Sequence, residues 1–82
     1  MEVSAIRLVS AGKIKAKVDI RTSEGFIIKG FKVIEEDNGF FVGMPSERAK
    51  TGKYIDTVKV EDPAQKEMLE SLVMDAYRKK IK

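Results

Sequence analysis

The sequence predicts an α+β domain, with an antiparallel sheet of about four to five strands followed by one C-terminal α-helix. Three observations predict this class. Apolar and polar residues alternate from Lys13 to Arg21, an Asn38-Gly39 pair separates two apolar runs, and Asp62-Pro63 opens a stretch with helical periodicity. The 82 residues contain no internal repeat and no change of composition. We therefore expect a single domain over residues 1–82.

The first half of the chain predicts three strands. An apolar residue stands at every second position from Ile14 to Ile20, which is typical of a strand with one buried and one solvated face. A strand around Val3–Val9 precedes it, joined by the turn residues Ser10-Ala11-Gly12. The third strand, Phe26–Glu35, is apolar on both faces and contains Gly30. A glycine inside a strand often marks a bulge or a close backbone approach.

The fourth strand is expected at Phe40–Met44, directly after Asn38-Gly39. Asn-Gly tolerates positive φ at both central positions of a tight hairpin turn. This strand is again apolar on both faces, and one helix can cover only one face of a sheet. Either a partner subunit covers the other face, or Gly30 shifts the phase of its strand. A weaker strand is expected at Tyr54–Val60, which is rich in β-branched residues but does not alternate.

The C-terminal helix has a clear start. Asp62 is a good N-cap, Pro63 suits the first helical position, and Gln65 can complete a capping box. Apolar residues then recur at helical spacing and form one stripe: Met68, Leu69, Leu72, Val73, Ala76, Tyr77 and Ile81.

Composition argues against an enzyme. The chain has no histidine and no cysteine, so the commonest general base, metal ligand and thiol nucleophile are absent. Glu35-Glu36-Asp37 could bind a hard cation, but charged residues are also usual at a solvated hairpin tip, and we favour that interpretation. We expect no cofactor. The apolar runs are far shorter than the ~20 residues that a membrane span needs. With no signal-peptide pattern, the sequence predicts a cytoplasmic protein without membrane insertion.

The segment from Asn38 to Arg48 carries a family resemblance. Its run Gly39-Phe40-Phe41-Val42-Gly43-Met44-Pro45-Ser46 resembles the stage V sporulation protein G (SpoVG) family, small bacterial proteins linked to septation. The resemblance extends over nearly the whole chain. It includes Met1-Glu2-Val3, Ile6-Arg7-Leu8, Phe26-Ile27-Ile28, Lys32-Val33-Ile34, Gly52, Tyr54, Asp56 and Tyr77-Arg78.

The chain departs from the family pattern at two places. Glu47 stands where a lysine is usual, and Val60-Glu61-Asp62-Pro63 replaces a His-Pro pair. The resemblance implies a homodimer that binds DNA or RNA in the control of septation, the cell cycle or developmental (sporulation) gene expression. A rival hypothesis is a septation-linked module that binds a protein partner and no nucleic acid.

Three basic groups are candidates for nucleic-acid binding in a chain of net charge +3. The groups are Lys13, Lys15 and Lys17 on a strand face, Arg48, Lys50 and Lys53 after Met-Pro-Ser, and Arg78, Lys79 and Lys80 at the helix end.

Each group also has a purely structural interpretation. The strand lysines can serve solubility and protect a sheet edge. Arg48 can pair with Glu47 or Asp56 and so hold its loop. The basic residues at the helix end complement the helix dipole. No helix-turn-helix, zinc finger or aromatic RNA-binding motif is present to argue for base-specific readout.

Overall fold

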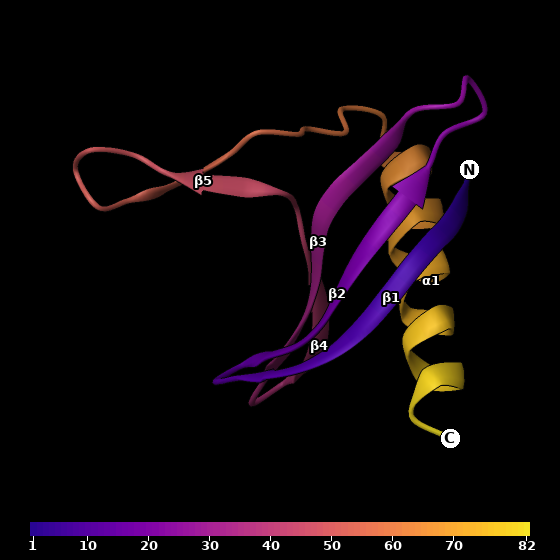
Figure 1. The fold of residues 1–82 in the computed structure, drawn as a ribbon, viewed down its shortest axis with the longest axis horizontal. Coiled ribbons are helices and arrows are strands. Elements are labelled where there is room, and N and C mark those ends of the chain that lie inside the picture. The colour runs from indigo at the N-terminus through magenta and orange to yellow at the C-terminus, as the bar shows by residue number, and fades with distance from the viewer.

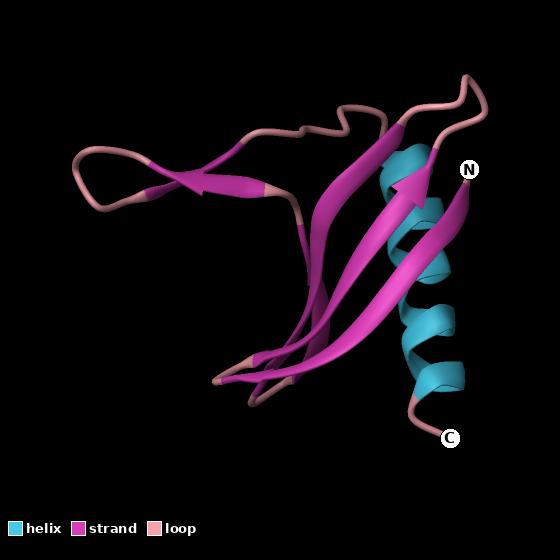
Figure 2. Cartoon of the chain, in the orientation of Figure 1, coloured by secondary structure: helices cyan, strands magenta, loops and turns pink.

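The computed structural model describes residues 1–82 and confirms the predicted α+β class (Figure 1). Strands β1 (Glu2–Ala11), β2 (Ile14–Arg21), β3 (Ile27–Glu36) and β4 (Gly39–Gly43) form one antiparallel sheet in that order. Helix α1 (Pro63–Lys80) lies across one face of this sheet and leaves the other face open (Figure 2). Helix α1 is not long and apolar enough to cross a membrane.

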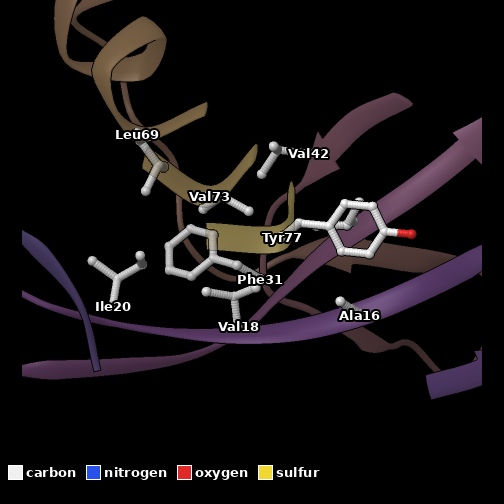
Figure 3. Packing of buried hydrophobic residues seen from close by; sticks show 9 residues of the cluster. Ala16, Val18, Ile20, Phe31, Val42, Leu69, Val73 and Tyr77 are labelled. Carbon is white, nitrogen blue, oxygen red and sulfur yellow. The ribbon is translucent and has the colours of Figure 1, made fainter. Parts of the chain in front are cut away.

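The core lies between α1 and the covered face of the sheet (Figure 3). Only ten of the 82 residues are buried, and no polar side chain is among them. The phenol ring of Tyr77 also packs against the ring of Phe40, and the two ring centroids are 5.6 Å apart. The core is therefore small, as the chain length predicts. Its members are Ala16, Val18, Ile20, Phe31, Val33, Val42, Leu69, Val73 and Tyr77.

A bulge at Lys15 corrects the predicted strand face. Ala16 pairs with Val33, but Ile14 pairs with Ile34, so Lys15 is an extra residue on β2. The prediction that Ile14 shares one buried face with Ala16, Val18 and Ile20 is therefore wrong. The Ile14 side chain lies on the open face, because the extra residue shifts the two-residue alternation.

A second bulge confirms the prediction made at Gly30. Val18 pairs with Phe31 and Ile20 with Ile28, so β3 has one residue more than β2 between these pairs. Gly30 has φ +104°, a conformation that favours glycine. Because of the extra residue, Ile28 and Phe31 both pack against the core. The alternation of β3 therefore shifts by one residue at Gly30. This was one of the two explanations offered for a strand that is apolar on both faces.

The β3–β4 hairpin is present, but its turn differs from the prediction. Glu36 pairs with Gly39, so the two central turn residues are Asp37 and Asn38. Neither has positive φ, and the left-handed conformation falls instead on Gly39 at φ +124°.

The helix starts where the sequence predicts. The Ala64 N–H donates to Asp62 Oδ1 at 2.9 Å, and Pro63 is the first helical residue. Gln65 makes no hydrogen bond back to Asp62, so the cap has one half of the expected box.

The segment after Pro45 forms a second, two-stranded sheet. Strand β5 (Ser46–Arg48) pairs antiparallel with β6 (Tyr54–Asp56). This hairpin projects away from the main sheet on the side opposite the helix (Figure 1). The sequence analysis treated the segment around Arg48 as a loop, where the structure has β5, and expected the last strand to continue to Val60. The strand ends at Asp56, and residues 57–62 form the connection to α1.

Candidate nucleic-acid interface

The base of the β5–β6 hairpin is fixed by the bulge in β3. Pro45 is buried, and its Cβ lies 3.5 Å from the place that a Cβ on Gly30 would occupy. The Thr57 N–H donates to the Pro45 carbonyl at 2.8 Å and closes the hairpin base. Proline cannot donate to a sheet, which explains why the chain leaves β4 here. Gly30 and Pro45 together direct the hairpin away from the main sheet, on the side of its open face.

The hairpin carries the second predicted basic group. Arg48 ends β5, and Lys50 and Lys53 lie in the tip between the strands. Backbone bonds from Ala49 N–H to the Lys53 carbonyl and from Gly52 N–H to the Ala49 carbonyl order this tip. All three basic side chains are exposed, and none is in an ion pair. The alternative pairing of Arg48 with Glu47 or Asp56 is thus not made.

The first predicted group is divided by the bulge at Lys15. Lys13 Nζ lies 2.8 Å from Glu36 Oε2, and Lys15 Nζ lies 3.7 Å from Glu35 Oε1. Both lysines line one hollow at the turn end of the sheet, together with Asp37. Lys17 lies elsewhere on the open face. The structure therefore does not bring the three lysines into one line.

Lys17 belongs instead to a row of cations that crosses three strands. It is directly opposite Arg7 on β1 and Lys32 on β3. None of the three is in an ion pair, and the nearest acidic residue along β2 on this face is Asp19. The Lys32 ammonium donates only to the Ser46 hydroxyl, at 3.2 Å. The sequence analysis missed Arg7 and Lys32, because cross-strand register is not visible within a single strand's pattern.

A concave corner forms where the hairpin meets the open face. Ile14, Lys17 and Lys32 from the sheet and Ser46 and Tyr54 from the hairpin line a cavity of about 480 Å³. We call this the corner cavity. The Tyr54 side chain is 72% exposed although it lines the cavity. The corner cavity thus combines two ammonium groups, a hydroxyl and an accessible aromatic ring, a set suited to binding rather than to catalysis.

The third predicted group lies apart from the corner cavity. Arg78, Lys79 and Lys80 end α1, which covers the opposite face of the sheet (Figure 1). Arg78 Nη1 pairs with Asp75 Oδ1 at 3.3 Å, and the other two basic side chains are exposed and outside any ion pair. Within one chain, the structure does not bring the helix end together with the hairpin.

Comparison with known proteins identifies the family of this chain. The family model SpoVG matches residues 1–79. The chain belongs to the SpoVG family. This family is of the regulatory or septation type and is not a known enzyme family.

Relatives from three bacteria illustrate the extent of the similarity. A protein of Agathobacter rectalis is 32% identical over 99% of this chain and 97% of its own length. One of Bdellovibrio bacteriovorus is 32% identical over 100% of this chain and 78% of its own. One of Clostridium perfringens SM101 is 36% identical over 90% of this chain and 83% of its own. The names of all three relatives describe them as septation proteins and include the designation SpoVG.

Proposed function

We propose that this SpoVG protein is a cytoplasmic regulator that binds DNA or RNA in septation, cell-cycle or developmental gene control. One observation carries the proposal. Arg48, Lys50 and Lys53 stand on a projecting hairpin without carboxylate partners, and the row of Lys17 and Lys32 lies at the hairpin base. Basic side chains that are already exposed and unpaired can contact phosphates without first giving up an ion pair.

We also propose that the protein acts as a homodimer. The open face of the sheet carries an apolar pair, Ile34 and Phe41, which lie directly opposite each other on β3 and β4 and have no helix over them. The Phe41 side chain is 45% exposed. A second subunit would duplicate every basic group, including the separate helix end, and would raise the number of phosphate contacts to roughly six to ten.

A second candidate function is a septation-linked module that binds a protein partner. The hairpin also exposes an apolar side chain, Ile55, at 57%, and Glu47 lies directly opposite it. Glu47 stands where the family pattern has a lysine. A mixed apolar and acidic face of this kind suits a protein surface better than a phosphate backbone.

Titration against labelled DNA and RNA of one sequence at several salt concentrations separates the two candidates. A nucleic-acid binder loses affinity linearly in log–log form, by ~0.9 per phosphate contacted on duplex DNA. Arg48→Ala should then weaken binding to all sequences. Arg21→Ala is the matched control, because Arg21 is paired with Glu2 at 3.2 Å and lies outside the hairpin.

Glu47→Lys supplies the second arm of the test. This variant should tighten nucleic-acid binding, since it replaces a negative charge with a positive one on the projecting hairpin. Absence of binding by the wild-type protein even at low salt would refute the proposal and favour the protein-binding module. An unchanged affinity in Arg48→Ala would remove Arg48 from the interface.

A further inference from the structure

We propose that the corner cavity binds one nucleotide of a single strand, with its phosphate on Lys17 and Lys32 and its unpaired base against Tyr54. This inference rests on the proposed function and goes further, because it names a position in the fold and the class of nucleic acid. The sequence analysis named neither Lys32 nor Tyr54 as a candidate binding residue. Both are brought to Lys17 by the fold.

The two lysines provide an anion site. They are directly opposite each other on neighbouring strands, where Cβ atoms are about 4.5–5.5 Å apart. At this spacing two lysine side chains can reach the oxygens of one phosphate. Like charges in such a pair repel, and no carboxylate lies within ion-pair distance of either lysine. A bound phosphate would remove this repulsion, and the Ser46 hydroxyl beside Lys32 would be in place for a further hydrogen bond.

Tyr54 provides the aromatic surface. Its ring lies on the hairpin, outside the core, and most of it is open to solvent. The ring borders the same cavity as the two lysines, and Ile14 adds an apolar wall. A base stacks on an aromatic ring only when its own face is free, so this site selects single strands over duplexes. The volume of about 480 Å³ falls in the range of small-ligand pockets.

The hairpin register extends this site in one direction. Arg48 is directly opposite Tyr54 across the two strands, and Lys50 and Lys53 follow in the tip. The next phosphate of a strand whose base lies on Tyr54 would therefore meet Arg48. We infer that the strand runs from the sheet at Lys17 and Lys32 outward along the hairpin.

The test uses fluorescence anisotropy of the full chain with a labelled oligothymidylate and with a duplex of equal length. Tyr54→Thr removes the ring but keeps a β-branched residue in the strand. Tyr54→Phe keeps the ring and is the rescue variant. The double variant Lys17→Gln/Lys32→Gln removes the anion site. Its matched control is Lys13→Gln/Lys15→Gln, which removes two lysines that are paired with Glu36 and Glu35.

We expect Tyr54→Thr to weaken single-strand binding by about 5-fold or more and to leave duplex binding within about 2-fold. Tyr54→Phe should bind as the wild type does. The Lys17/Lys32 double variant should lower the salt slope on single strands by about 0.7, the value for one lost phosphate contact, and the Lys13/Lys15 control should leave it unchanged. A single strand carrying 5-iodouracil should cross-link to Tyr54 on irradiation.

Two results would overturn the inference in different ways. If the Tyr54 and Lys17/Lys32 variants bind single strands as the wild type does while Arg48→Ala binds weakly, the corner cavity is not the site and the proposed function stands. If the wild-type protein binds neither probe at low salt, both proposals fail. A loss of binding in Tyr54→Phe as large as in Tyr54→Thr would refute base stacking, and circular dichroism establishes that each variant is folded.

Discussion

Lys17→Glu should make the free protein more stable while it weakens binding to nucleic acid. In the native chain, Lys17 is opposite Arg7 on one side and Lys32 on the other, so one substitution turns two like-charged cross-strand pairs into two opposite-charged pairs. A cross-strand pair of this kind contributes about 0.2–1 kcal/mol, and like charges directly opposite are destabilising.

The size of the effect follows from these two pairs. Two new ion pairs give a gain of roughly 0.5–2 kcal/mol in the free energy of unfolding. Asp19 reduces this gain, because it lies two residues along β2 on the same face, ~6.7 Å away, and would repel the new carboxylate. The side chains are solvent-accessible, so the gain should shrink as salt is added. For a domain of this size, 1 kcal/mol corresponds to about 4–8 °C in Tm.

Thermal and urea unfolding of Lys17→Glu and Lys15→Glu at low and high salt provides the measurement. Lys15 lies on the same strand but is paired with Glu35, so Lys15→Glu creates a carboxylate pair and should lower stability. The two variants carry the same change in net charge, which removes any general charge effect. A Lys17→Glu protein that is less stable than the wild type, or that shifts in the same direction as Lys15→Glu, would refute the inferred row of repelling cations.

Four further outcomes can be measured on the same protein. Gly30→Ala should cost about 1–3 kcal/mol by urea unfolding, because φ +104° is strained for alanine although its Cβ would meet only ordinary contacts. Phe31→Ala, which empties a fully buried core position, should cost about 3–5 kcal/mol, and a loss below ~1 kcal/mol would contradict the described core. Asp62→Ala should cost about 0.5–2 kcal/mol and lower helix content by circular dichroism, since the Ala64 N–H loses its acceptor. Hydrogen bonds from its own backbone N–H and from the Ser23 and Thr22 side chains lower the pKa of Glu24, so an NMR titration should place its midpoint below the ordinary value of 4.5. Because the folded-state pKa is lowered, the stability from this carboxylate is present above the unfolded-state pKa and is lost as pH falls through the folded value; Ser23→Ala should move the midpoint back toward 4.5.

The main sheet and the helix could be predicted because their signals are local. Asp62 and Pro63 mark the helix start within two residues, and the alternation around Val18 reflects a strand whose two faces meet different environments. The face of Ile14 could not be predicted. Its position depends on an extra residue relative to β3, and a bulge of this kind is a property of two strands that no single pattern contains.

The candidate interface was predicted in part. Arg48, Lys50 and Lys53 form a group because they lie close together in the sequence. Arg7, Lys17 and Lys32 are 10 and 15 residues apart and meet only through strand register. Strand β5 could not be predicted for a different reason, because its three residues Ser46-Glu47-Arg48 include no apolar side chain and so show no alternation. Sequence reasoning therefore finds charge clusters along the chain and misses those that run across it.

The hairpin of β5 and β6 contributes no residue to the buried core. The free energy needed to open its backbone is therefore largely independent of the free energy of unfolding of the whole domain. Its strands pair with each other and contact the main sheet mainly at the base, through Pro45, Thr57 and the Lys32–Ser46 bond. A two-stranded ribbon of this length is marginal in water. Its amide protons should therefore exchange through local opening while those of β2 and β3 remain protected. Substitutions at the hairpin tip can then alter recognition without changing the global unfolding transition, because the tip can open while the core stays folded.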